Sequence, residues 1–237
     1  MVRYGIIGCG MMGREHIRNI NLLEKAKVTA IVEPNCKMIE LVKPLAPEAK
    51  FFNQTKDFLR CAEIDCVVIA TPNFCHINNL LEIASKISKP LLIEKPVVTR
   101  LVDVQKLLQF AKEYRSPIWV AMEYRYMPIL QEFLSKVKPV TGKVEMLSIR
   151  EHRYPFLKKV DNWNRFNKLT GGTFVEKCCH FFDLMRLITS SEPVQVMASG
   201  GQACNHLAET YKGKKADIWD SGYVLVDFEN GTRSMLE

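Results

Sequence analysis

Three glycines near the start of the chain have the spacing of a turn that binds a diphosphate. Gly8, Gly10 and Gly13 form a G-x-G-x-x-G pattern directly after the apolar segment 2–7. Between a strand and a helix, such glycines permit a tight turn, a close approach of the backbone to the pyrophosphate and close packing of the helix on the strand. The first amides of the helix then point at the phosphates. The pattern predicts a dinucleotide site formed by Gly8, Gly10, Met11, Met12 and Gly13.

An acidic residue at the end of the next apolar segment predicts which dinucleotide binds. Glu33 follows Gly13 by 20 residues, the usual distance to the acid that accepts hydrogen bonds from the ribose hydroxyls. Its carboxylate would repel a 2′-phosphate, and Pro34 and Asn35 supply no arginine to bind one. We therefore expect NAD, with NADP the less favoured cofactor. The alternative is a structural glycine turn with an incidental acid nearby.

Further polar residues follow two other apolar segments, 66–70 and 91–93. If these segments are parallel strands, the residues lie at their carboxyl ends, where open α/β sheets bind ligands. Simpler interpretations exist: Asn73 would be a helix cap, His76 a surface histidine, and the Glu94–Lys95 pair solvated. The residues expected at the cofactor site are Thr71, Pro72, Asn73, His76, Glu94 and Lys95.

A second group of candidates lies on a predicted helix from Gly172 to Ile188. Glu176, His180 and Asp183 are spaced i, i+4 and i+7, so they share one face of a continuous helix. A carboxylate beside an imidazole fixes its tautomer and raises its basicity, which suits proton transfer. A solvated polar stripe is the alternative interpretation.

The elements that must position these residues change character along the chain. Through residues 1–123, short apolar segments alternate with helical ones, which predicts parallel strands joined by right-handed crossovers. Residues 124–237 instead contain long strand candidates and a hairpin turn at Glu229–Gly231. We expect an α/β fold: an N-terminal Rossmann parallel sheet, followed by an α+β domain with a mostly antiparallel open sheet. Because the chain stops inside a strand candidate, we expect this second domain to be incomplete at its C-terminus.

Composition narrows the class of protein. The net charge of +7 comes from scattered Lys and Arg residues, so it suits anionic small ligands and does not indicate nucleic acid. The eight cysteines contain no C-x-x-C pair, and no metal site is predicted. The chain starts with no signal-peptide pattern, and no apolar run approaches the roughly 20 residues of a membrane helix. We expect a cytoplasmic protein with free thiols and no membrane partner.

In combination, four segments resemble the glucose–fructose oxidoreductase, inositol dehydrogenase and MocA (Gfo/Idh/MocA) family: "GCGMMG", "VEPN", "ATPNFCHINNLLEIASKISKPLLIEKP" and "GGTFVEKCCHFFDLMRLI". The resemblance covers nearly the whole chain. It implies an NAD(P)-dependent oxidoreductase that transfers a hydride between a nicotinamide cofactor and a sugar, polyol or related alcohol. It also implies a substrate domain whose open sheet often forms the interface of a homo-oligomer.

The resemblance implies roles for individual residues. It places Lys95 between the nicotinamide and the substrate, where an ammonium group stabilises negative charge on the reacting oxygen. It makes His180 the general acid or base, held by Glu176 or Asp183; the family has aspartate where this chain has Glu176. Arg125 matches an arginine that orients cofactor or substrate, or that pairs with an acid in the core.

The substrate-binding residues are expected in a loop rich in aromatic and basic residues, together with the two catalytic groups. Guanidinium groups and aromatic faces suit polyhydroxylated ligands, although such a loop can also be purely structural. The expected set is Lys95, Arg153, Trp163, Arg165 and His180. Two alternative functions stay open: a non-catalytic NAD-binding regulator or inactive shortened form, and an NAD-dependent glycosidase that uses transient oxidation.

Overall fold

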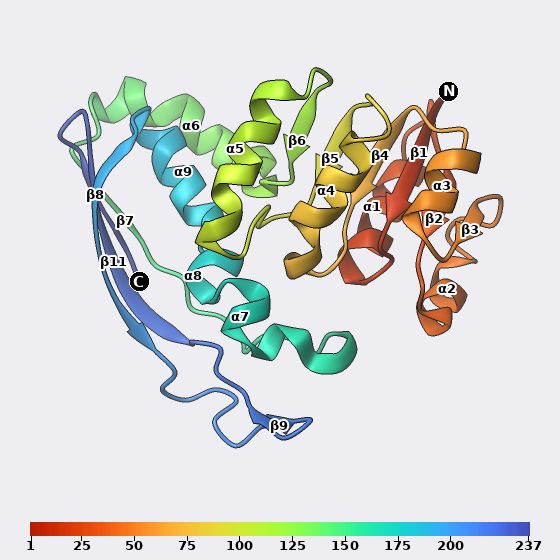
Figure 1. Ribbon diagram of the computed structural model, residues 1–237. Helices are drawn as coiled ribbons and strands as arrows, with labels where there is room; N and C mark the ends of the chain where they lie inside the picture. Colours follow the sequence, from red (N-terminus) through yellow and green to blue (C-terminus); the bar gives the residue numbers. More distant parts are fainter. The chain divides into compact units, whose positions relative to one another are not determined.

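The computed structural model describes residues 1–237, apart from the side chain of Cys61. The chain divides into two compact units, Met1–Ala121 and Met122–Glu237, and Figure 1 labels most of their helices and strands. The sequence placed this boundary between residues 123 and 124. Each unit has its own sheet and is described by itself.

The first unit contains a six-stranded sheet in the order β3-β2-β1-β4-β5-β6, and every neighbouring pair is parallel. The order reverses between β1 and β4, and open α/β sheets bind ligands at the carboxyl edge of such a reversal. The expected Rossmann sheet is therefore confirmed. Its strands are β1 (Val2–Ile7), β2 (Ala26–Val32), β3 (Lys50–Phe52), β4 (Cys66–Ile69), β5 (Leu91–Ile93) and β6 (Ile118–Val120).

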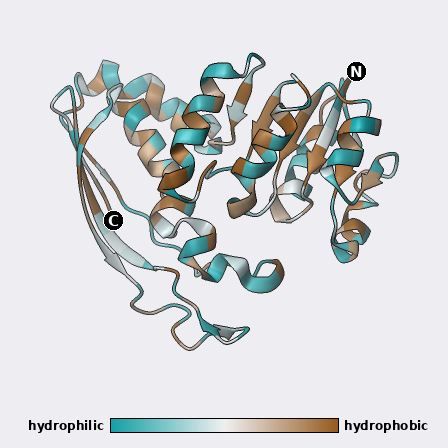
Figure 2. Ribbon diagram, in the orientation of Figure 1, coloured by the Kyte–Doolittle hydropathy of each residue, from teal (hydrophilic) through white to brown (hydrophobic). Residues whose placement is uncertain are grey.

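Helices cover both faces of this sheet, which explains why the buried parts of its strands are mostly apolar (Figure 2). Along β4, Val67 and Ile69 belong to one buried cluster with α3, α4 and α5, whereas Val68 belongs to a second cluster with α1 and α2. The helices are α1 (Met11–Asn21), α2 (Cys36–Val42), α3 (Thr55–Cys61), α4 (His76–Ala84) and α5 (Val104–Glu113), with 3-10 turns η1 (Asn73–Cys75) and η2 (Leu101–Asp103).

The second unit contains a four-stranded sheet in the order β7-β12-β11-β8. β11 is antiparallel to both of its neighbours, whereas β12 and β7 are parallel. The expected mostly antiparallel sheet is confirmed. The strands are β7 (Met146–Ile149), β8 (Pro193–Gly201), β11 (Ser221–Phe228) and β12 (Arg233–Leu236), and β9 (Thr210–Tyr211) pairs separately with β10 (Lys214–Lys215).

One face of this sheet packs on a helix, and the other is left open. Phe181 and Met185 of α9 form a buried cluster with Val224, Val226 and Phe228 of β11. Tyr223 and Leu225, which alternate with them on β11, point the other way and are exposed, as the period of two of a strand requires. The helices of this unit are α6 (Pro128–Thr141), α7 (Asn167–Thr170), α8 (Thr173–Glu176) and α9 (Cys179–Thr189), with η3 (Glu123–Tyr126) and η4 (Val160–Arg165).

The long helix expected from Gly172 to Ile188 is interrupted. α8 ends at Glu176 and α9 begins at Cys179. At the break the carbonyl of Thr173 accepts hydrogen bonds from both the Lys177 amide, at 2.9 Å, and the Cys178 amide, at 3.2 Å. The second bond spans five residues, so the turn is wider than an α-helical turn. The expectation that Glu176 shares one continuous helix with His180 is therefore wrong.

No helix in the described part of the chain is both long and apolar enough to cross a membrane. The described residues also include no cluster of three or more His, Cys, Asp or Glu side chains that could bind a metal ion.

Candidate active site

The glycine turn of the first unit is shaped by three different constraints. Gly8 has φ +90°, and a Cβ there would lie 2.7 Å from the Ala70 carbonyl oxygen. A Cβ on Gly13 would lie 2.0 Å from the Gly8 oxygen. Around Gly10, in contrast, no atom lies within 4 Å of the Cβ position. The backbone at Gly10 therefore borders open space that a side chain would fill, which fits the close approach of a ligand.

The helix that follows this turn offers free amides. The first helical hydrogen bond of α1 runs from the Arg14 amide to the Gly10 carbonyl, at 3.1 Å. The amides of Met11, Met12 and Gly13 precede it, and no acidic residue lies in the first turn. Helix N-termini of this kind bind phosphates through their amides and their partial positive charge.

Glu33 is fixed against the turn by the backbone. The side chain is 8% exposed, and its Oε2 accepts a hydrogen bond from the Cys9 amide at 2.8 Å. Its Oε1 accepts from the Asn35 amide at 3.0 Å. The carboxylate thus lies at the end of β2 beside the glycine turn, as the spacing predicted. Burial first, and Glu33 second, raise the pKa of the Cys9 thiol to about 12, so this thiol stays protonated and is no nucleophile at neutral pH.

The residues that follow β4 are tied to one another. Thr71 Oγ1 donates a hydrogen bond to Asn79 Oδ1 at 2.8 Å. His76 is 1% exposed, and its ring nitrogens lie 2.7 Å from the Pro96 oxygen and 2.8 Å from the Thr71 oxygen. The surface interpretation of His76 is therefore wrong, because the ring joins the ends of β4 and β5. Asn73 is 6% exposed and is the first residue of η1, and the N-cap positions of η1 and α4 belong to Pro72 and Cys75. The helix-cap interpretation of Asn73 is therefore wrong.

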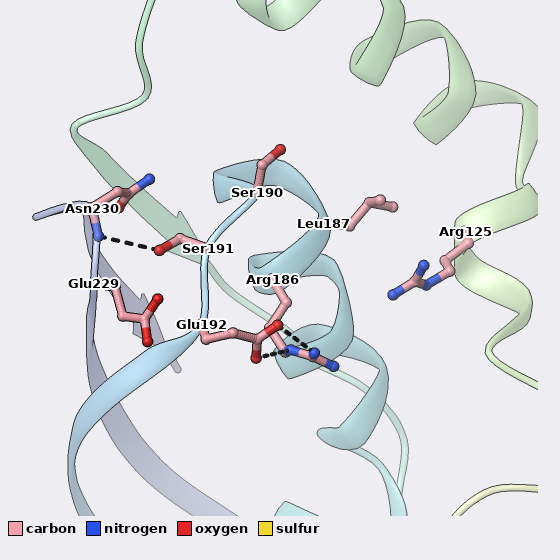
Figure 3. Close-up of a pocket in the computed structure, with 8 residues that line it drawn as sticks. All are labelled: Arg125, Arg186, Leu187, Ser190, Ser191, Glu192, Glu229 and Asn230. Carbon is pink, nitrogen blue, oxygen red and sulfur yellow. Dashed lines mark hydrogen bonds and ion pairs between the residues drawn. The ribbon is translucent and has the colours of Figure 1, made fainter.

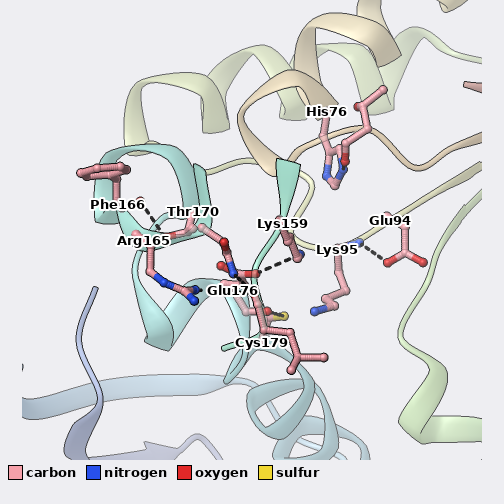
Figure 4. A network of polar contacts seen from close by, with 12 residues as sticks. His76, Glu94, Lys95, Lys159, Arg165, Phe166, Thr170, Glu176 and Cys179 are labelled. Carbon is pink, nitrogen blue, oxygen red and sulfur yellow. Dashed lines mark hydrogen bonds and ion pairs between the residues drawn. The ribbon is translucent and has the colours of Figure 1, made fainter. Parts of the chain in front are cut away.

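The Glu94–Lys95–Pro96 turn at the end of β5 is also not a solvated pair. Glu94 is 5% exposed, and its Oε1 accepts a hydrogen bond from His16 Nε2 at 2.7 Å. Its Oε2 accepts from the Lys95 amide at 3.3 Å, drawn as a dashed line in Figure 4. The Lys95–Pro96 peptide bond is cis. His16 is a residue that sequence reasoning missed, since it lies 78 positions from Glu94.

In the second unit, His180 lies at the start of α9 among aromatic and acidic groups. It is 1% exposed, and its ring stacks on Tyr124 with 4.4 Å between centroids and 12° between planes. Its Nε2 lies 3.4 Å from Glu123 Oε1. The ammonium group of Lys177 donates to the Tyr124 hydroxyl and lies 4.8 Å from the centroid of that ring. The imidazole is thus fixed in the interior of the unit.

The two carboxylates expected beside His180 have basic partners. Glu176 is 4% exposed, and its Oε1 lies 3.5 Å from the ammonium of Lys159 (Figure 4). Asp183 accepts two hydrogen bonds from Arg125, at 2.5 and 2.6 Å. These bonds raise the pKa of Arg125 above its ordinary value. Of the two roles expected for Arg125, the structure therefore shows the pairing with an acid.

The expected substrate-binding residues of the second unit differ in accessibility. Arg165 is 2% exposed and donates to Glu209 at 2.9 Å, which favours a structural role over contact with substrate. Arg153 is exposed and pairs with Glu151 at 3.4 Å. Trp163 is half-buried, with the Lys159 ammonium 4.5 Å from its ring centroid. Lys159 is a second residue that the sequence analysis did not single out.

An open pocket of about 640 Å³ lies at the end of α9 (Figure 3). Two of its charged side chains are paired: Arg186 donates to Glu192 at 2.7 and 2.5 Å, and Arg125 is bound to Asp183, which lies outside the lining. Its lining residues are Arg125, Arg186, Leu187, Ser190, Ser191, Glu192, Glu229 and Asn230.

Comparison with known proteins decides the family. Residues 2–122 match the model of the "Oxidoreductase family, NAD-binding Rossmann fold", and residues 139–237 match that of the "Oxidoreductase family, C-terminal alpha/beta domain". The chain belongs to this oxidoreductase family, GFO_IDH_MocA. Membership supports the oxidoreductase function expected from the sequence, and no comparison favours a regulator or a glycosidase.

Individual relatives of this oxidoreductase-family chain are distant. It is 23% identical to the rhizopine catabolism protein MocA of Rhizobium meliloti, over 99% of this chain and 70% of that protein. It is 24% identical to myo-inositol 2-dehydrogenase of Thermotoga maritima, over 100% of this chain and 68% of the relative. The chain thus spans about two thirds of the length of these curated relatives, and in some others it covers 65% or 61%.

A solved structure supports the fold. Myo-inositol dehydrogenase from Lactobacillus casei, solved in complex with NAD(H) and myo-inositol, superposes with a TM-score of 0.78 at 20% identity. The match covers 100% of this chain and 66% of that one. Both units of the chain thus have the fold of the family's dehydrogenases.

Proposed function

We propose that this chain is an NAD-dependent dehydrogenase that oxidises a hydroxyl group of a sugar, a polyol or a related alcohol. The observation that carries the proposal is the open space at Gly10, between two glycines at which a Cβ would collide with backbone. A turn built in this way leaves room for a diphosphate at the N-terminus of α1. NAD, when bound, supplies the hydride acceptor, and the chain supplies orientation and proton transfer.

The two catalytic groups have different tasks in this proposal. Lys95 donates a hydrogen bond from its ammonium group to the substrate oxygen and stabilises the negative charge that develops there. His180 accepts the hydroxyl proton, because an imidazole exchanges protons near neutral pH. The buried position of His180, fixed by its stacking on Tyr124, suits a base that must keep one orientation. Glu176 or Asp183 is proposed to hold His180, and Trp163 is proposed to bind the same substrate.

NAD is preferred over NADP in this proposal because of Glu33. Both oxygens of this carboxylate are fixed by backbone amides beside the glycine turn. A fixed negative charge there accepts hydrogen bonds from ribose hydroxyls and repels a 2′-phosphate. Asn35, which follows it, uses its side chain to cap α2 through the Lys37 amide at 3.0 Å.

Calorimetry with NAD and NADP, followed by a panel of polyols and sugars monitored for reduced cofactor, tests the proposal. We expect NAD to bind more tightly than NADP and at least one polyol or sugar to yield NADH. A folded protein that releases no heat with either dinucleotide would contradict it. Binding of NAD without reduction would point to a regulator, and bond cleavage without accumulation of NADH to a glycosidase. The Lys95→Ala variant should lose most of its turnover with the best substrate.

We also propose that the chain forms a homo-oligomer through the open face of its second sheet. Leu225 is 46% exposed, and its neighbour in register, Met197, is 53% exposed. Met235 lies opposite Leu225 on the other side. Contiguous apolar side chains on an open sheet face mark an interaction surface.

The free thiols of the cysteines whose side chains are described suit a reducing compartment, which supports a cytoplasmic location.

A further inference from the structure

A buried hydrogen bond joins the helix of the glycine turn to the turn that carries Lys95. His16 lies in α1, three residues after Gly13. Its Nε2 donates to Glu94 Oε1 at 2.7 Å, and the two side chains are 18% and 6% exposed. A carboxylate this deeply buried is stable only when its oxygens accept hydrogen bonds or pair with a charge. The hydrogen bond therefore holds both side chains in place inside the protein.

The second oxygen of Glu94 extends the connection to Lys95. Glu94 Oε2 accepts from the Lys95 amide at 3.3 Å, and the Glu94 amide donates to the Ile69 carbonyl at 2.9 Å. The carboxylate therefore contacts α1 with one oxygen and the backbone of Lys95 with the other. At the other end of the Glu94–Lys95–Pro96 segment, His76 Nδ1 lies 2.7 Å from the Pro96 oxygen. Together these bonds define where the backbone of Lys95 lies relative to α1.

We propose that His16 is a positioning residue for Lys95, which acts through the Glu94 carboxylate and couples the diphosphate-binding helix to the Glu94–Lys95–Pro96 turn. The inference rests on the proposed function of Lys95. Its physical basis is that an ammonium group helps catalysis only at a defined distance from the reacting oxygen. α1 would bind the cofactor, and Glu94 directly precedes Lys95. The His16–Glu94 hydrogen bond would therefore fix the backbone of Lys95 relative to the bound cofactor, and with it the reach of the ammonium group to the reacting oxygen.

Two variants of His16 separate a positioning role from a stabilising one. His16→Ala leaves Oε1 of Glu94 without this donor, whereas the side-chain amide of His16→Gln restores one near the position of Nε2. We expect kcat of His16→Ala to fall by about 10- to 100-fold, since small misplacements of a catalytic group have effects of this size. The dissociation constant for NAD should change less than about threefold, and His16→Gln should recover most of kcat.

Glu15→Gln is the matched control. Glu15 lies next to His16 on α1, but it forms an exposed pair with Arg18, in which the side chains are 51% and 52% exposed. Removing such a pair changes little. This variant should therefore keep the wild-type kcat, KM and NAD affinity.

A spectroscopic measurement tests the contact without turnover. In protein labelled with [15N]histidine, a buried imidazole N–H bonded to a carboxylate gives a downfield proton signal that exchanges slowly with water. We expect one such signal to be lost in both His16→Gln and Glu94→Ala. Failure of wild-type protein to bind NAD would refute the proposed function but not this contact. NAD binding with an unchanged kcat in His16→Ala, or a loss of kcat that His16→Gln does not restore, would overturn the positioning role.

Discussion

At the scale of single residues, the candidate cofactor site depends on small groups with narrow tolerances. Gly8 and Gly13 are required by backbone contacts already present in the protein, whereas Gly10 is required only once a ligand approaches. Glu33 serves the protein and its ligand together, because the carboxylate that would meet the ribose also orders the Cys9 and Asn35 amides. Substitutions at these positions should therefore distinguish effects on the stability of the fold from effects on the affinity for NAD.

Gly10 and Gly13 should differ in which of these two quantities a substitution changes. Gly10→Ala should keep the wild-type melting temperature, because its Cβ enters open space. It should weaken NAD binding by about tenfold or more, since the methyl group occupies the position of the diphosphate. Gly13→Ala should instead lower the free energy of unfolding by about 1–3 kcal/mol, because its Cβ collides with Gly8. Thermal unfolding and calorimetry of both variants check this; equal NAD affinity in Gly10→Ala and wild type would contradict it.

Glu33→Gln tests cofactor choice. The amide keeps the size of the side chain and one acceptor oxygen, but it removes the negative charge. We expect the ratio of the NADP and NAD dissociation constants to shift toward NADP by about tenfold, because a charged hydrogen bond to ribose is lost and a repulsion is removed. Titration of both cofactors measures the ratio. A ratio that stays at the wild-type value would assign the preference to other residues.

At the scale of elements, interruptions in helices and hydrogen bonds between neighbouring segments decide where side chains point. The wide turn between α8 and α9 gives Glu176 and His180 different helices, and their partners Lys159 and Tyr124 come from two further segments. A hydrogen bond between distant segments also holds the end of η4 in place: Arg165 donates to Glu209, which lies immediately before β9.

The pairing of Glu209 predicts a dependence of stability on pH. Hydrogen bonds from His206, then Tyr211 and Arg165, lower the pKa of Glu209 to about 2, from an ordinary value of 4.5. A folded-state pKa below the unfolded value gives stabilisation that is complete above about pH 4.5 and is lost as the pH falls toward 2. Urea unfolding of wild type and Glu209→Gln at about pH 6 and about pH 3 measures this difference. The gap in stability between the two proteins should narrow at the lower pH; a constant gap would contradict the assignment.

At the scale of the whole molecule, each unit buries its own core, and the second leaves one sheet face open. Val224, Val226 and Phe228 face the helix, whereas Tyr223 and Leu225 are 58% and 46% exposed. The period of two along β11 alone produces this division, and it creates the surface that we propose to associate.

Charge placed on that face tests the oligomer. Leu225→Lys should shift the molar mass from light scattering toward the monomer, because it buries an unpaired ammonium in the proposed interface. The fold should persist, since the side chain is already exposed and makes no contribution to the buried cluster. Lys212→Glu, an exposed change in the loop between β9 and β10, is the control. A wild-type protein that is monomeric at all concentrations would refute this proposal.

The sequence by itself determined the features that depend on local spacing and period. Apolar segments between helical ones predicted the parallel sheet, and the spacing of the glycines and Glu33 predicted the cofactor turn. Both patterns could be recognised because each extends over only a few tens of consecutive residues. The tertiary structure alone decided which distant groups meet: His16 with Glu94, Arg125 with Asp183, Lys159 with Glu176. It also divided the predicted helix at Lys177. Contacts of this kind depend on how elements pack, and neither the period of a helix nor the spacing of a motif contains that information.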